Sequence, residues 1–268
     1  MMDYHLHTSL CRHAHGELEE YRNAAVQKGI KEIGFADHFP LKLLGINLET
    51  PISMEPEELA YYVDHVLRIS RESTIPVKLG IEVDYLPGKT EEIAYILQEY
   101  PFDYVIGSVH FIGDWDCTHP HYRDEYHRRP LMEIYRDYFS LIIEACNSGL
   151  FDIIAHADAV KKFAHFLPER EVTPFYKKAA VALRRHQVCL ELNTAGWDVD
   201  AGELYPAPAF LEECLQEGVE FTLGSDAHSP AQVGRHFDSL LNILVEKGVK
   251  RLTGFSGRSK YYCDLPEG

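Results

Sequence analysis

The alternation of short apolar runs with amphipathic stretches constrains the fold of this chain more than any other feature. Seven runs of three to five residues have the composition of buried strands: 3–6, 33–36, 77–81, 104–106, 153–155, 188–192 and 220–223. Helical periodicity is found in seven further stretches: 17–28, 56–71, 89–99, 131–147, 173–186, 207–217 and 231–247. Because strands that alternate with helices pair in parallel through right-handed crossovers, this order predicts an α/β fold with a parallel sheet.

The number of units favours a closed sheet. The chain has 268 residues, which matches a TIM-like barrel of roughly 250 residues, and it lacks the glycine fingerprint of a dinucleotide-binding open sheet. It contains no repeat, low-complexity segment or flexible linker. We therefore predict one domain over residues 1–268, a distorted (β/α)7 barrel, with an extended segment added at 251–265.

Charge and composition exclude several classes of function. The chain has 26 Lys and Arg against 42 Asp and Glu, a formal charge of −16, which argues against nucleic acid as a partner. No apolar run approaches the roughly 20 residues that span a bilayer, and the first residues lack an apolar signal core. The six cysteines are scattered without a Cys-X-X-Cys pair. We expect a cytoplasmic protein with reduced thiols, no membrane partner and an oligomeric state that the sequence leaves open.

Histidine and carboxylate side chains follow six of the seven expected strands. The first strand ends in His5 and His7, whose side chains point to the same side of an extended backbone and can hold one ion. The other strand ends carry the same residue types: Asp37, His38, Glu82, His110, His156, Asp158, Asp226 and His228. Because parallel strands in a barrel end on one face, where such folds place their active sites, this pattern predicts a metal site.

These motifs resemble the polymerase-and-histidinol-phosphatase (PHP) superfamily over residues 3 to about 240. The matching motifs are His-Leu-His at 5–7, Phe-Ala-Asp-His at 35–38, Gly-Ile-Glu at 80–82, Gly-Ser-Val-His at 107–110, Ala-His-Ala-Asp at 155–158 and Gly-Ser-Asp-Ala-His at 224–228. Other segments are similar to the stand-alone histidinol-phosphate phosphatases of that superfamily: Leu-Cys-Arg-His-Ala at 10–14, Tyr-Pro-Phe-Asp-Tyr-Val-Ile-Gly-Ser-Val-His at 100–110, Lys-Lys-Phe at 161–163 and Leu-Asn-Thr-Ala-Gly at 192–196. The resemblance implies a distorted (β/α)7 barrel that binds two or three divalent ions.

The same resemblance implies the ligand set, which has seven imidazoles and two carboxylates. Its members are His5, His7, His13, His38, Glu82, His110, His156, Asp226 and His228. Glu82 would bridge the first two ions, and Asp37 and Asp158 would orient ligand imidazoles. Nitrogen and oxygen ligands suit Zn, Fe or Mn. His15 is the alternative to His13, and Cys11 is interpreted as a packing residue.

A metal cluster of this kind suits phosphate chemistry. Divalent ions can lower the pKa of bound water towards ~7 and neutralise phosphoryl oxygens. Our hypothesis is that hydroxide held by the cluster attacks phosphorus in a small phosphomonoester, with Glu82, Asp226 and His228 catalytic through the ions. The resemblance implies L-histidinol phosphate as the substrate, hydrolysed to L-histidinol and phosphate in histidine biosynthesis.

Substrate contacts are predicted from nearby basic residues and one long loop. Lys161 and Lys162 follow His156, and Arg235 follows His228, so each is a candidate to neutralise phosphate oxygens. The loop at 113–130 is long for a compact domain, and such loops are often active-site lids.

Other readings remain open at this point. One is a PHP-type phosphoesterase with another substrate: a nucleotide, a phosphotyrosine protein or a phosphodiester. A second is an amidohydrolase-type metal barrel, although no expected strand end offers the lysine that such sites often carboxylate. A third is a non-enzymatic metal-binding or regulatory barrel. An open set of mixed ligands favours catalysis over a closed structural site.

Overall fold

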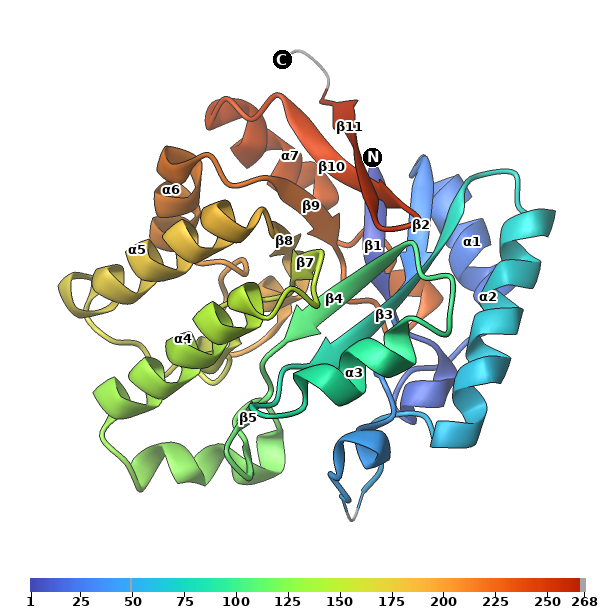
Figure 1. Ribbon diagram of the computed structural model, residues 1–268. Coiled ribbons are helices and arrows are strands. Elements are labelled where there is room, and N and C mark those ends of the chain that lie inside the picture. The colour runs from blue at the N-terminus through green and yellow to red at the C-terminus, as the bar shows by residue number, and fades with distance from the viewer. Residues whose placement is uncertain (49, 266–268) are drawn as a thin grey trace. The chain divides into compact units, whose positions relative to one another are not determined.

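The computed structural model describes residues 1–48 and 50–265, and its main feature is a seven-stranded sheet. The strands are β1 (Met2–Leu6), β2 (Glu32–Phe35), β3 (Val77–Asp84), β4 (Tyr104–Ser108), β7 (Ile153–Ile154), β8 (Cys189–Asn193) and β9 (Phe221–Gly224), and they lie in that order (Figure 1). Pairing is parallel in β1–β2, β2–β3 and β7–β8. Strand order therefore follows chain order, which is the arrangement that successive βα units produce.

The first strand also contacts the segment that follows the last. A parallel bridge joins Leu6 to Ala227, and His7 N donates to Ala227 O at 3.0 Å while Ala227 N donates to His5 O at 3.1 Å. Strand β1 thus has neighbours on both sides, β2 and the segment after β9. The prediction of an α/β fold with a seven-stranded, nearly closed barrel is confirmed.

Within the described residues, seven α-helices connect or follow these strands, in the stretches that periodicity predicts. They are α1 (Leu18–Gln27), α2 (Leu59–Glu72), α3 (Thr90–Leu97), α4 (Leu131–Asn147), α5 (Glu169–His186), α6 (Pro208–Glu217) and α7 (Phe237–Glu246). Two of the predicted starts are wrong. Helix α5 begins four residues before residue 173, because the helix accommodates Pro174 in its interior. Helix α7 begins six residues after residue 231, because Gly234 and His236 have positive φ angles that interrupt a helix.

The chain divides into two compact units. One comprises Met1–Val83, Glu91–Ile106 and Thr222–Gly268, and the other comprises Asp84–Thr90 and Gly107–Phe221.

In the first unit, a tyrosine fills the space left by two glycines. A Cβ atom on Gly80 would lie 2.3 Å from the Tyr104 ring, and one on Gly34 would lie 2.1 Å from its hydroxyl group. Tyr104 is fully buried, donates to Tyr4 O at 2.6 Å and stacks on the Tyr4 ring at 4.7 Å. Glycine at both positions is therefore required by close packing.

The expected extended segment near the C-terminus is an antiparallel hairpin, β10 (Arg251–Ser256) and β11 (Ser259–Asp264). It lies beside β1 and β2 (Figure 1). Phe255 N donates to the Tyr4 hydroxyl at 3.1 Å, and Gly257 N donates to Asp103 Oδ1 at 3.0 Å. The hairpin is thereby attached to strand β1 and to the residue that precedes β4.

In the second unit, α4, α5 and α6 pack side by side (Figure 1). Their contact is aromatic: Tyr176 stacks on Phe210 at 4.8 Å, and Phe139 lies against both rings. The loop at 113–130 is largely ordered. It contains part of a short hairpin, β5 (Phe111–Ile112) with β6 (Trp115–Asp116), and a 3-10 helix at Pro120–His127.

Among the residues that the structure describes, no helix is both long enough and apolar enough to cross a bilayer.

Candidate metal centre

Three imidazoles surround one buried carboxylate oxygen in the first unit. Glu82 Oε2 lies 3.3 Å from His5 Nε2, 3.6 Å from His7 Nε2 and 3.0 Å from His38 Nδ1. His5 and His7 come from the end of β1, His38 follows β2 and Glu82 lies on β3. The exposed fraction of Glu82 is 1%. These side chains meet because parallel neighbouring strands bring their carboxyl ends to the same edge.

Asp226 and His228 join this group from the segment after β9. Asp226 Oδ1 lies 3.3 Å from His7 Nε2 and 3.5 Å from His228 Nδ1. The His228 ring stacks on His7 at 4.1 Å and on His13 at 4.6 Å. Ligand atoms of His7, His38 and His228 all lie within 4.8 Å of one another. The seven side chains that the sequence predicts as ligands within this unit are therefore clustered.

Backbone contacts hold Asp226 in an unusual conformation. Its φ angle is +50°, a region that residues other than glycine rarely adopt. Arg235 Nε donates to Ser225 O at 2.8 Å, and Arg235 Nη2 donates to Asp226 O at 2.9 Å. Asp3 accepts from Ser225 N at 2.9 Å and from Ser225 Oγ at 2.6 Å. The turn that presents Asp226 is thus fixed from two sides.

Protonation states in this cluster differ from one imidazole to the next. Burial, together with the neighbouring His7, lowers the pKa of His228 to about 2. Burial, with His38 and His7 nearby, lowers the pKa of His13 to about 4. Burial opposes ionisation of Asp226, but the charge of His5 and the hydrogen bond to His7 outweigh it and hold the pKa of Asp226 well below the usual value. Burial opposes the charge on His7, but its hydrogen bonds to Asp226 and Asp37 outweigh that effect and raise the pKa of His7 well above the usual value. A metal ion that binds His7 therefore has to displace a proton from it, whereas His13 and His228 already have the neutral form that divalent metals bind.

The residues present also fit a metal by hydrogen bonding. Buried polar atoms in proteins are nearly always paired. His228 Nε2 is buried and lacks a hydrogen-bond partner within the described ranges 1–48 and 50–265. Nitrogen and carboxylate oxygen ligands are typical of zinc, iron and manganese sites. The cluster therefore has the chemistry of a divalent-metal centre.

In the second unit, the two remaining predicted ligands lie beside each other. The rings of His110 and His156 are 5.1 Å apart. His110 Nδ1 lies 2.9 Å from Asp84 Oδ1, and His156 N donates to Glu191 Oε2 at 3.0 Å. His156 has a φ angle of +28°, so it too has a strained backbone.

Sequence reasoning missed Asp84 and Glu191, the two carboxylates that contact these histidines. Asp84 was detectable, because Glu82 and Asp84 are alternate residues of β3 and so face the same side of the sheet. Glu191 had a weaker signal: it is a buried acidic residue two positions before Asn193 in an apolar strand.

The residues expected to support the ligands are placed differently from one another. Asp37 Oδ1 lies 3.6 Å from His7 Nδ1, which agrees with an orienting role. Asp158 instead contacts Lys161 Nζ at 3.0 Å and accepts from Ala207 N at 2.8 Å. Cys11 is fully buried, and its Sγ lies within 4.8 Å of ligand atoms of His13 and His228, so its interpretation as a packing residue stays a prediction. His15 N donates to His228 O at 2.9 Å.

The three basic residues predicted to bind phosphate differ in burial and in hydrogen-bond partners. Lys161 is 1% exposed, and its ammonium group contacts Asp158, Glu203 and Leu204 O within 3.1 Å. Contact with a phosphate would require those bonds to break. Arg235 is half-buried and donates to the backbone at Ser225 and Asp226. Lys162 is half-buried, with Nζ 5.9 Å from the centre of the Phe163 ring.

The loop at 113–130, the predicted lid, is held by hydrogen bonds within itself and by a contact with Val160, which follows β7. Asp116 Oδ1 accepts from Thr118 N and Thr118 Oγ1, both at 2.9 Å. The Tyr126 hydroxyl donates to Val160 O at 2.8 Å. His121 and His127 are exposed on its surface, whereas His119 is half-buried and its Nδ1 accepts from His121 N at 3.2 Å.

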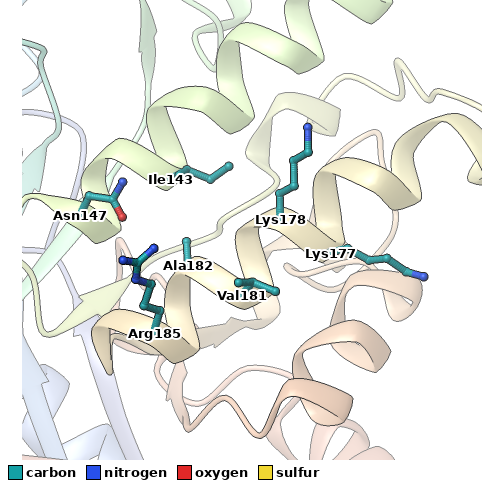
Figure 2. Close-up of a pocket in the computed structure, with 7 residues that line it drawn as sticks. All are labelled: Ile143, Asn147, Lys177, Lys178, Val181, Ala182 and Arg185. Atoms are coloured by element: carbon teal, nitrogen blue, oxygen red, sulfur yellow. The ribbon is translucent and has the colours of Figure 1, made fainter.

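A surface groove in the second unit does not belong to the metal centre. It has a volume of about 430 Å³ and lies between α4 and α5 (Figure 2). Its lining consists of Ile143, Asn147, Lys177, Lys178, Val181, Ala182 and Arg185. None of these side chains is a histidine, cysteine or carboxylate, so the groove offers no usual metal ligand.

Comparison with known proteins shows which family this chain belongs to. The family model described as "PHP domain" matches residues 3–195. A protein named probable histidinol-phosphatase from Deinococcus radiodurans is 38% identical over 256 residues, which cover 94% of this chain and 96% of that protein. The histidinol-phosphatase of Bacillus subtilis is 26% identical over 265 residues, which cover 89% of this chain and 97% of that protein.

A solved structure shows the same fold. It is the histidinol phosphate phosphatase of Lactococcus lactis, described as complexed with zinc, L-histidinol and phosphate, and it matches with a TM-score of 0.82 and 22% identity. The match covers 97% of this chain and 98% of that one. Family match, relatives and fold agree with the motifs at the strand ends. The chain belongs to the PHP domain family, and its full-length relatives include histidinol-phosphatases.

Proposed function

We propose that this protein is a metal-dependent phosphomonoesterase that hydrolyses L-histidinol phosphate to L-histidinol and phosphate. The observation that carries the proposal is the convergence of His5, His7 and His38 on Glu82 Oε2 at 3.0–3.6 Å, with Asp226 beside them. Such a cluster of imidazoles and carboxylates suits divalent ions. The names of relatives that match nearly the whole chain support the choice of substrate.

Nine side chains are proposed to hold two or three divalent ions: His5, His7, His13, His38, Glu82, His110, His156, Asp226 and His228. The ligand chemistry supports Zn, Fe or Mn. When bound, such ions stabilise negative charge on phosphoryl oxygens and lower the pKa of water. The sign of the local charge then favours a dianionic substrate in spite of the total charge of −16.

The chain's own groups prepare the site in three ways. Glu82 and Asp226 supply the two negative charges among the proposed ligands. Asp37 lies close enough to His7 to orient its ring, and Asp84 does the same for His110. Arg235 holds the turn at Asp226 through two hydrogen bonds to the backbone. These contacts fix the ligand geometry before the substrate arrives, so less ordering is required during the reaction.

Phosphate recognition is proposed for Lys162 among the three basic candidates. The ammonium donors of Lys161 and much of the Arg235 guanidinium are used inside the chain. We further propose that residues 1–268 act as one catalytic domain in the cytoplasm, on a small-molecule substrate and without nucleic acid.

The test is a substrate panel combined with elemental analysis of the purified protein. The panel contains histidinol phosphate, a nucleoside monophosphate, a phosphotyrosine peptide and a phosphodiester. We expect bound zinc, iron or manganese, and a kcat/KM for histidinol phosphate at least 100-fold above that for the other compounds. A higher kcat/KM for any other member would reassign the substrate, and metal-bound protein without activity on the panel would refute a phosphoesterase.

A further inference from the structure

Lys161 is a buried cation whose bonding capacity is used within the chain. Its Nζ lies 3.0 Å from Asp158 Oδ2, 3.1 Å from Glu203 Oε2 and 2.8 Å from Leu204 O. An ammonium group has three N–H donors, and these three acceptors match them in number. Nζ also lies 5.3 Å from the centre of the Tyr205 ring. The side chain therefore joins two segments of the chain.

The second of these segments is Glu203–Ala207. Lys161 holds its first two residues, and Asp158 Oδ2 accepts from Ala207 N at 2.8 Å. Between those anchors, Tyr205 exchanges two backbone hydrogen bonds with Asn193, at 2.7 and 3.1 Å. The Asp158–Lys161 pair thus attaches Glu203–Ala207 to the turn that follows His156.

His156 lies between the groups that this arrangement fixes. Its ring meets the Tyr205 ring edge-on, with 6.3 Å between centres. Its backbone N donates to Glu191 Oε2, which also accepts from Asn193 Nδ2 at 2.9 Å. The positive φ angle of His156 is costly for a residue with a Cβ atom, and surrounding contacts must maintain it.

We propose that Lys161 is a positioning residue for His156. With Asp158, it fixes Glu203–Ala207, so that Tyr205 on one side and the Asn193–Glu191 pair on the other hold the His156 imidazole ready for a metal ion. This inference rests on the proposed function only in treating His156 as a metal ligand. It replaces the predicted role of Lys161 in binding phosphate.

The test uses the holoenzyme and compares Lys161→Met with the wild type. Two properties are measured: the rate at which metal passes to a chromogenic chelator, and kcat and KM for histidinol phosphate with excess metal, together with the inhibition constant of inorganic phosphate. Loss of an indirect support for a metal ligand typically weakens metal binding by about 10- to 100-fold. We expect metal release at least ~10-fold faster, with KM and the phosphate inhibition constant changed by less than about 2-fold.

Two further variants keep the test decisive. Lys178→Met removes an exposed lysine from α5 in the same unit and should release metal at the wild-type rate. If Lys161→Met does not fold, the double variant Asp158→Asn/Lys161→Met removes both buried charges, keeps an acceptor for Ala207 N and should still release metal faster. The proposal is overturned if the variant that folds releases metal at the wild-type rate but has a KM raised 10-fold or more. That result would show that Lys161 binds phosphate directly.

The metal-release measurement is independent of the substrate. If the wild type binds metal but does not hydrolyse histidinol phosphate, the proposed function fails, while the role of Lys161 is still decided by the release rates. If the wild type is active but Lys161→Met changes neither metal release nor kcat, the role of Lys161 fails and the proposed function stands.

Discussion

Replacing Arg235 by methionine tests whether the turn at Asp226 is held from outside the metal cluster. The guanidinium donates to Ser225 O at 2.8 Å and to Asp226 O at 2.9 Å. Methionine keeps much of the aliphatic stem and removes both donors. The carbonyl groups then lose their charged partner, and Asp226 must keep its φ angle of +50° without it.

The size of the effect follows from these two bonds. A hydrogen bond to a charged group contributes about 1.5–3 kcal/mol when buried. Because Arg235 is half-buried, we take about 1 kcal/mol for each, or about 2 kcal/mol together. For a protein of this size, a loss of about 2 kcal/mol in the free energy of unfolding lowers Tm by about 4–8 °C. If the whole amount is used to place Asp226, metal affinity falls about 30-fold, since 1.4 kcal/mol is a factor of ten.

The assays are thermal unfolding of the metal-loaded protein, metal retention measured by elemental analysis, and steady-state kinetics with excess metal. Arg235→Lys keeps the charge but cannot reach both carbonyls with one planar fork, so we expect an intermediate loss. Arg22→Met is the control: it removes a half-buried arginine of α1 whose guanidinium bonds to the neighbouring Asn23 side chain, and it should leave Tm and metal content unchanged. Full metal retention with KM raised 10-fold or more would refute this reasoning and show that Arg235 binds phosphate.

Three other predictions follow from the described contacts. Glu82→Gln keeps the side-chain volume but removes the charge on which three imidazoles converge. Bound metal and kcat should both fall more than about 100-fold, and circular dichroism is the control for folding. An active, metal-loaded variant would contradict the assignment of Glu82 as a metal ligand. Gly80→Ala places a Cβ atom 2.3 Å from the buried Tyr104 ring, so the free energy of unfolding should drop by about 2–3 kcal/mol in denaturant titrations, whereas an unchanged midpoint would show that Tyr104 can move. A thiol reagent should modify one exposed cysteine, Cys263, rapidly in the native protein, because the other five cysteines are buried. Burial raises the pKa of Cys263, so at pH 7 the reagent should modify Cys263 more slowly than free cysteine. The rate of modification should rise as the pH approaches the pKa of Cys263. Fast modification of a second thiol would contradict the described burial.

Periodicity in the sequence was sufficient for the architecture. The seven expected strands and seven expected helices are all present, because a buried strand or an amphipathic helix is encoded by residues that are neighbours in the chain. The exceptions are helix starts. Helix α5 begins at Glu169, four residues before the predicted start, and two positive φ angles shorten α7.

The candidate site was predictable to the extent that it depends on strand order. Once β1, β2 and β3 are parallel neighbours, His5, His38 and Glu82 must end near one another, and they do. The same rule, applied to alternate residues of β3, would have found Asp84 beside His110. Resemblance to a family supplied the full ligand set, including His13, which lies outside the strand ends and which local pattern alone does not give.

The sequence by itself determined the order of strands and helices and the residue types at the strand ends, because both depend on the spacing of residues that are close together in the chain. Only the tertiary structure decided the roles of the charged residues around them. Lys161 reads as a basic residue beside a ligand, yet it is buried between Asp158 and Glu203. Arg235 reads the same way, yet it holds the backbone at Asp226. The hydrogen-bond partners of these two side chains are not their neighbours in the sequence. Glu203 lies 42 positions from Lys161, and Asp226 lies 9 positions from Arg235. Only the packing of the folded chain brings each pair together.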